Sequence, residues 1–227
     1  MSWTGLEVYY TPGSPGCRAV LMCIRELELE VELIKLDMYQ KYEHKKPWFI
    51  RMNPQHTVPT INDNGFILWE SRAIMQYLVS KYGSHKNSLY PTEPMARAAV
   101  DKILFFDIGT LYKSLVDYFH PQLMSGEEPD ERKGNAFKQS LDYLDQFLET
   151  SRYVAGDTLT IADISVLASV TQLEGMDYRI TSYAHLYKWV ERLKKELPYY
   201  DDCNTAGIET FRTWTRNQRL SKKLGSK

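Results

Sequence analysis

The sequence is poor in cysteine. Its 227 residues include three, Cys17, Cys23 and Cys203. An odd and sparse set with no Cys-x-x-Cys spacing argues against a disulfide framework or a paired-thiol redox motif. We interpret them as reduced thiols of a cytoplasmic protein.

An excess of charge and a long apolar run are also missing. The 28 basic and 29 acidic residues give a formal net charge of -1, which leaves no surplus for attracting a nucleic-acid backbone or an anionic membrane. No apolar run approaches the roughly 20 residues that cross a bilayer. The start, Met-Ser-Trp-Thr-Gly, lacks the basic and apolar parts of a signal peptide. We therefore expect a water-soluble cytoplasmic protein that binds neither nucleic acid nor membrane.

Hydrophobic residues are plentiful, at 43% of the chain, and aromatic residues make up 13%. This content is sufficient for a large buried core. Because a typical domain has about 150 residues, the length favours two domains or one large domain.

Residues 1–83 change their hydrophobic period repeatedly, which predicts alternating strands and helices. The turn signal Asp63-Asn64-Gly65 lies between two short apolar runs and indicates a hairpin. The expected order is β-α-β-α-β-β-α, a four-stranded sheet covered by helices. The segments with the clearest periods are the strands 6–10, 31–36, 60–62 and 66–69 and the helices 18–27 and 71–82.

Residues 84–94 are polar, contain two prolines, and read as a linker. From residue 95 to residue 227, apolar and polar residues do not alternate as they would in strands. Apolar residues instead recur at steps of three and four. We expect an all-helical second domain, interrupted at 126–130 and 154–158 and thus divided into at least three helices. The basic segment 216–227 is interpreted as a solvated tail.

A Pro/Gly-rich turn, Thr11-Pro12-Gly13-Ser14-Pro15-Gly16, joins the first strand to the first helix. Ser14 is placed to cap that helix, and Pro15 suits its first turn. The amides at a helix N-terminus attract an anion, and a hydroxyl there can donate a hydrogen bond to the same anion. By itself, the turn is also consistent with a helix cap that has no further role, and a single serine does not decide between the two.

Two further segments offer groups to an extended peptide. In Asn53-Pro54-Gln55-His56-Thr57-Val58-Pro59-Thr60, the proline that opens a strand leaves the backbone of Val58 free to pair with a ligand, water or neighbouring chain. In Glu70-Ser71-Arg72, an acid and a possible N-cap begin a helix and could bind an ammonium and a carboxylate. An ordinary strand start and an ordinary capped helix are the alternatives.

Together with Gly-Asp-x-Leu-Thr-Ile-Ala-Asp at 156–163, these segments resemble the cytosolic glutathione transferases, most closely the insect delta class and next the epsilon class. The resemblance extends from about Leu6 to about Trp214. It implies a thioredoxin-like first domain that holds reduced glutathione, a helical second domain that shapes a pocket for small hydrophobic electrophiles, and a homodimer. The implied activity is conjugation in detoxification, with peroxide reduction or dehydrohalogenation as side activities and no metal.

The resemblance also implies residue roles. Ser14 would activate the thiol, and Val58, followed by a cis Pro59, would pair with the cysteinyl backbone of glutathione. Glu70, Ser71 and Arg72 would hold the γ-glutamyl end with support from Asp107, while His44 and His56 match positions near the glycyl end. The residues implied for the electrophile pocket are Tyr112, Leu115, Phe119, His120, Leu123 and Phe211.

Several of these residues have simpler interpretations. His44 and His56 have no further ligand at metal-binding spacing, so solvated loop histidines are the alternative to ligand contacts. Tyr112, Leu115, Phe119 and Leu123 form a helical stripe that could be core alone, near Pro121, which should kink or end the helix. Cys17 lies in the first helical turn, where a reactive thiolate is conceivable.

Two other functions therefore stay open for the fold. One is a non-enzymatic ligand carrier or interaction module, as in the gamma subunit of translation elongation factor 1. The other is a glutathione-dependent thiol oxidoreductase that uses Cys17.

The segment Leu159-Thr160-Ile161-Ala162-Asp163-Ile164 predicts the start of a helix in the second domain. Thr160 is the expected N-cap and Asp163 its reciprocal partner three residues on, with Leu159 and Ile164 as a hydrophobic staple. We expect this capping box to stabilise the fold and to take no part in the chemistry.

Overall fold

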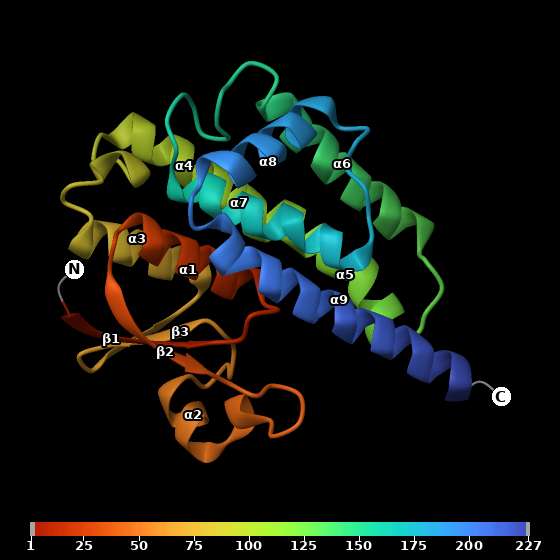
Figure 1. Cartoon of the computed structure of the whole chain (residues 1–227). Helices are drawn as coiled ribbons and strands as arrows, with labels where there is room; N and C mark the ends of the chain where they lie inside the picture. The colour runs from red at the N-terminus through yellow and green to blue at the C-terminus, as the bar shows by residue number, and fades with distance from the viewer. Residues whose placement is uncertain (1–2, 226–227) are drawn as a thin grey trace.

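Four strands and three helices make up the N-terminal part of the molecule in the computed structural model, which describes residues 3–225 (Figure 1). The order is β-α-β-α-β-β-α, as the sequence predicts. The elements are β1 (Trp3–Tyr10), α1 (Pro15–Glu26), β2 (Glu30–Lys35), α2 (Pro47–Met52), β3 (Thr60–Asp63), β4 (Phe66–Trp69) and α3 (Ser71–Tyr82), with a short 3-10 turn, η1 (Glu43–Lys45), before α2.

The sheet has the strand order β2-β1-β3-β4. β1 is parallel to β2 and antiparallel to β3, and β3 is antiparallel to β4 across the predicted hairpin. Leu6 and Val8 on the central strand β1 are fully buried. This is a thioredoxin-like arrangement, and it confirms the predicted fold of the N-terminal domain.

Helix α1 lies between the sheet and the helical part of the molecule (Figure 1). It packs against α3 on one side and against α7 (Ile161–Thr171) on the other. Its side chains are buried along almost its whole length, from Pro15 to Ile24. The N-terminus of α1 is thereby held at the boundary between the two parts of the molecule.

The rest of the described chain is helical, which confirms the all-α second domain. Both predicted interruptions separate helices: one follows α5 and the other precedes α7. The helices besides α7 are α4 (Pro94–Phe106), α5 (Tyr112–Met124), α6 (Glu131–Phe147), α8 (Ala184–Glu196) and α9 (Tyr200–Gly225), with a π-helical turn η3 (Asp107–Leu111) and the 3-10 turns η2 (Asn87–Leu89) and η4 (Gln172–Met176). Pro121 lies inside α5, which ends three residues later at Met124.

Every residue of α7 is buried, so this helix forms the centre of the helical domain. Its N-terminus carries the predicted capping box between Thr160 and Asp163. The boundaries 1–83, 84–94 and 95–227 stay a prediction, although α3 ends at Tyr82 and α4 begins at Pro94.

The segment 216–227, interpreted as a solvated tail, is helical as far as Gly225, where α9 ends. Arg216 at its start is exposed, as expected for a solvated segment. Residues 226 and 227 lie outside the described residues. Between residues 3 and 225, no helix is long and apolar enough to span a membrane.

Candidate active site

Ser14 ends the turn after β1 and is the N-cap of α1. Its backbone is extended, and its Oγ accepts a hydrogen bond from the Cys17 amide at 3.3 Å. This bond uses a lone pair of the hydroxyl oxygen and leaves the hydroxyl hydrogen available for donation. The cap therefore fixes Ser14 and keeps its donor free.

Cys17 is fully buried one turn into α1. Burial raises the pKa of its thiol to about 11, although hydrogen bonds with Ser14 and Thr11 and the charge of Arg18 oppose the shift. Since the thiolate is the nucleophilic form, a buried thiol with a raised pKa is a poor nucleophile. The geometry argues against chemistry at Cys17.

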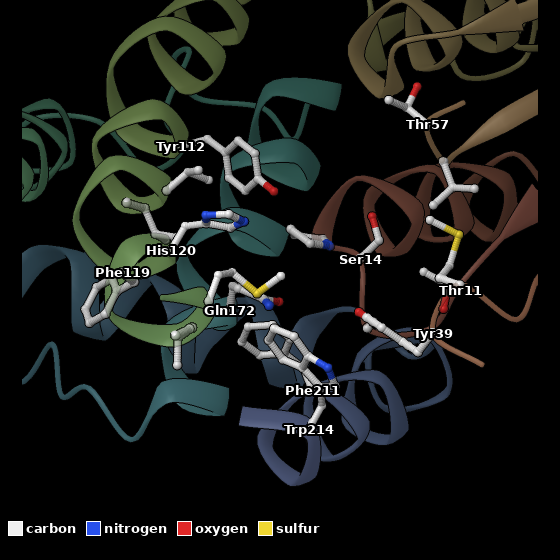
Figure 2. A pocket seen from close by; sticks show the side chains of 18 of the residues that line it. Thr11, Ser14, Tyr39, Thr57, Tyr112, Phe119, His120, Gln172, Phe211 and Trp214 are labelled. Carbon is white, nitrogen blue, oxygen red and sulfur yellow. The ribbon is translucent and has the colours of Figure 1, made fainter. Parts of the chain in front are cut away.

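Two adjoining cavities open beside Ser14, one of about 200 Å³ and one of about 420 Å³. Ser14 lines both. Figure 2 shows it on one side of the larger cavity, with Tyr112, Phe119 and His120 on the other. The other residues that line both cavities are Pro15, Thr57, Val58 and Tyr112. A molecule that fills the smaller cavity can thus place a reacting atom at Ser14, facing the larger one.

The smaller cavity contains the three residues at the start of α3. Glu70, Ser71 and Arg72 line it together. Sequence reasoning proposed Ser71 as a possible N-cap, but Glu70 occupies that position, with no capping side-chain bond and a backbone φ of 71°. Ser71 is instead the first helical residue, and its Oγ accepts from Arg72 Nη1 at 3.2 Å. A non-glycine residue at this φ is strained, and such strain is concentrated at functional sites.

Arg72 is held by a buried carboxylate. Its Nε and Nη2 both donate to Asp107 Oδ2, at 3.1 and 2.6 Å. Asp107 is fully buried in η3, and the same oxygen accepts from Ser165 Oγ at 2.5 Å. The other oxygen, Oδ1, has no partner among the described residues. This network fixes the guanidinium on the wall of the smaller cavity.

Sequence reasoning missed Ser165 and its neighbour Ser169, which also line the smaller cavity. Both are on α7, where every residue is buried and the sequence reads as core. On such a helix, the sequence does not show whether a serine lines a cavity or only packs against a neighbouring helix.

Val58 supplies an extended backbone between the two cavities. The Val58-Pro59 peptide bond is cis, and within residues 3–225 neither backbone group of Val58 forms a hydrogen bond. The loop before it is held by Asn53, which is fully buried and whose Nδ2 donates to the Thr57 carbonyl at 3.1 Å. The Val58 amide and carbonyl are therefore fixed in place and unpaired.

His44 and His56 lie near each other, with ring centroids 6.1 Å apart, and both line the larger cavity. His56 is exposed. His44 is buried, contrary to a solvated loop position, and its Nδ1 has no partner among the described residues. Burial lowers the pKa of His44, and the nearby charges of Lys45 and His56 act in the same direction. No cluster of potential metal ligands occurs in the described part of the chain.

The larger cavity is mostly apolar and lies between α5, α9 and the turn at Ser14. All six residues that the sequence resemblance implies for the electrophile pocket line it: Tyr112, Leu115, Phe119, His120, Leu123 and Phe211. Burial raises the pKa of Tyr112, so its hydroxyl is protonated and can donate at neutral pH. The lining residues that sequence reasoning missed include Met38, Tyr39, Gln172, Met176 and Trp214. They come from loops and turns without a periodic signal, or from the far end of α9.

Comparisons with known proteins agree with this arrangement. Family models for the N-terminal and C-terminal domains of glutathione S-transferase match residues 13–81 and 111–196. A Nilaparvata lugens delta-class glutathione transferase is 40% identical with a TM-score of 0.90, over 94% of this chain and 99% of that one. A Bombyx mori glutathione transferase is 42% identical with a TM-score of 0.87, over 92% and 97%. An epsilon-class enzyme of the housefly, Musca domestica, is 34% identical with a TM-score of 0.86, over 94% and 98%.

Proposed function

The chain belongs to the glutathione S-transferase family, and we propose that it conjugates the thiolate of reduced glutathione to small hydrophobic electrophiles in the cytoplasm, with Ser14 stabilising the thiolate. The observation that carries this proposal is the position of Ser14 on the wall common to both cavities. Retention on immobilised glutathione, together with turnover of a chlorinated nitrobenzene, tests it. A protein that is retained but turns over no electrophile would be a carrier of the same fold.

The energetic demand on Ser14 is modest. The thiol of glutathione resembles that of cysteine, with a pKa of about 8.5, so about 3% is ionised at pH 7. A pKa lower by about two units makes the thiolate the main form and requires about 2.7 kcal/mol. A hydrogen bond to a charged acceptor contributes about 1.5–3 kcal/mol, and a helix N-terminus adds about 0.3–1 kcal/mol. Ser14 at the N-terminus of α1 can supply both contributions.

Glutathione fits the smaller cavity in a definite direction. Its γ-glutamyl end carries an ammonium and a carboxylate, which complement the Glu70 carboxylate and the Ser71 and Arg72 donors, with Asp107 behind them. Its cysteinyl backbone can pair with the free amide and carbonyl of Val58 before Pro59. The glycyl carboxylate then lies toward His44 and His56. This direction places the sulfur at Ser14.

The γ-glutamyl site predicts a loss of affinity in two variants. Ser71→Ala and Arg72→Ala should each raise the dissociation constant for glutathione about tenfold or more, because each removes a hydrogen bond to a charged group. Calorimetric titration measures the effect. Ser80→Ala, an exposed serine on the same helix, serves as the matched control and should bind normally. Unchanged constants in both Ser71→Ala and Arg72→Ala would remove this site from the proposal.

The larger cavity is the proposed electrophile pocket. Its walls from α5 and α9, with Leu115, Phe119 and Phe211, suit apolar or aromatic molecules. Apolar contacts discriminate among such molecules by only a few kcal/mol, so a broad substrate range is expected. Conjugation, peroxide reduction and dehydrohalogenation assays across a panel of electrophiles would rank the activities.

We also propose a homodimer. Met95 and Phe105 on α4 are 82% and 73% exposed, and Phe66 on β4 is 49% exposed. At about 100° per residue, ten residues place Met95 and Phe105 about 80° apart around α4, so both lie on the same half of the helix. Exposed apolar side chains of this size favour burial in an interface. A second copy of the chain is the proposed partner.

Phe105→Glu should therefore convert the dimer to a monomer, because the introduced carboxylate would be buried without a partner. Light scattering coupled to size-exclusion chromatography measures the mass. Tyr143→Glu, at an exposed aromatic residue on α6, is the control and should leave the mass unchanged. A Phe105→Glu protein with the wild-type dimer mass would place the interface elsewhere.

A further inference from the structure

Arg18 is a fully buried cation on α1, four residues after Ser14. Its guanidinium donates to four neutral acceptors, and among the described residues no carboxylate accepts a hydrogen bond from it. The acceptors are Thr171 Oγ1 at 3.1 Å, Asn204 Oδ1 at 2.9 Å, the Ala168 carbonyl at 3.0 Å and Gln172 Oε1 at 2.5 Å. Burial lowers its pKa to about 10, so the side chain is charged at neutral pH. The charge of Glu174 also acts on this guanidinium, but its hydrogen bonds are made only to dipoles, and a buried charge orients such dipoles strongly.

Gln172 is the acceptor that reaches the larger cavity. It is 3% exposed, begins η4, and lines the larger cavity together with Ser14 (Figure 2). Because a guanidinium has donors and no acceptor, the amide must present its oxygen to Arg18. The orientation of the amide is thereby fixed.

The amide nitrogen of Gln172 consequently faces away from Arg18. Among the described residues, no group accepts a hydrogen bond from Nε2. This atom is also not one of the fully buried side-chain atoms that lack a partner, so part of its surface is accessible. Its two N–H groups are therefore donors directed at the cavity space. The charge of Arg18 on the oxygen side polarises the amide and strengthens these donors.

The surroundings of Gln172 make that donor selective. Phe119, Met176 and Phe211 line the same cavity, and among the described residues no acidic side chain lines it. In a mostly apolar wall, a donor that is fixed in place favours a molecule that carries an acceptor there and disfavours one that leaves the donor unpaired.

We propose that the Arg18-oriented amide of Gln172 is an acceptor-binding subsite of the electrophile pocket, selecting aromatic or apolar electrophiles that carry a carbonyl, nitro or carboxylate oxygen away from the reacting carbon. This inference rests on the proposed function and specifies the substrate class of the same site. Gln172 acts here as a specificity-determining residue, and Arg18 as a positioning residue.

The test compares two inhibitors that differ only in the acceptor group: S-(4-nitrobenzyl)glutathione and S-benzylglutathione. Neither carries a free thiol, so their affinities are independent of the role of Ser14. Gln172→Glu keeps an oxygen for Arg18 and the shape of the side chain but replaces the donor by an acceptor. Gln172→Leu removes the donor without adding charge. Gln146→Glu makes the same charge change at an exposed position on α6 and is the control.

Wild type and Gln146→Glu should bind the nitrobenzyl inhibitor more tightly than the benzyl inhibitor by about three- to tenfold, the factor that one hydrogen bond supplies. In Gln172→Glu and Gln172→Leu this preference should disappear, while S-benzylglutathione still binds. An unchanged preference in both variants would overturn the subsite and leave the proposed function intact. Failure of wild type to bind either inhibitor would overturn both.

Discussion

Replacement of Ser14 by alanine should lower the rate of conjugation at neutral pH about ten- to a hundredfold. The hydroxyl has a free hydrogen at the site where the two cavities meet, and its loss removes a charge-assisted hydrogen bond of about 1.5–3 kcal/mol. This loss raises the pKa of the bound thiol by about one to two units. Affinity for glutathione should change less, because the rest of the tripeptide is still held.

Ultraviolet absorbance of the thiolate during a pH titration of bound glutathione measures the effect directly. Because Ser14 also caps α1, Ser14→Gly is a second variant to test. Glycine removes the hydroxyl, but at an N-cap it lowers stability by only about a few tenths of a kcal/mol. Both variants should show the raised thiol pKa. If both titrations superimpose on that of wild type, Ser14 is only a helix cap.

Cys17→Ala is the control that separates two reactions. The Cys17 thiol is fully buried with a raised pKa, so its replacement should leave conjugation largely intact. A cysteine-based thiol oxidoreductase would behave in the opposite way, losing mixed-disulfide reduction in Cys17→Ala and keeping it in Ser14→Ala.

Local signals were enough to predict the fold. Three kinds of signal locate the ends of helices and strands to within a few residues. They are the turn Asp63-Asn64-Gly65, the changes of hydrophobic period before it, and the proline-rich turn at Ser14. The right-handed β-α-β connection and the hairpin then leave few ways to order four strands. The capping box at Thr160 was predictable for the same reason, since both partners lie within one turn of helix.

The polar residues around the cavities depend on contacts that no local signal encodes. Arg18 reaches Gln172 across 154 positions of sequence, and Ser165 reaches Asp107 across 58. In the sequence, Arg18 looks like a surface residue, and Ser165 looks like packing in an apolar helix. Their roles become visible only when α1, α7 and η3 are packed together, because a buried polar side chain must find a specific hydrogen-bond partner, whereas an exposed one can bond to water. The sequence left open whether His44 contacts a ligand or is a solvated loop residue, and its burial becomes visible only in the packed structure.

Replacement of Asp163 by alanine should be the most destabilising of these changes, by about 2–5 kcal/mol. The ordinary cost of losing an N-cap is about 0.5–2 kcal/mol, but Asp163 is fully buried and does more than cap α7. Its Oδ1 accepts from the Val154 amide at 2.9 Å, and its Oδ2 accepts from the amide and the hydroxyl of Thr160 at 2.9 and 3.0 Å. Alanine would leave these donors buried and unpaired. Urea unfolding measures the loss, and an unaltered midpoint would contradict it.

The same carboxyl gives that loss a definite pH dependence. Burial raises the pKa of Asp163 from 3.8 to about 6, although the hydrogen bonds from Val154 and Thr160 oppose the shift. The folded protein therefore holds the proton more tightly than the unfolded chain, so this stabilisation is present in full below about pH 4 and is lost as the pH rises through about 6. The difference in unfolding free energy between wild type and Asp163→Ala should be about 1 kcal/mol larger at pH 5 than at pH 7.5. Asp157→Ala, at an exposed position in the preceding loop, should show no such trend. An Asp163→Ala difference that is constant with pH would mean that the hydrogen bonds fully offset burial at this carboxyl, and one that grows with pH would mean that they outweigh it.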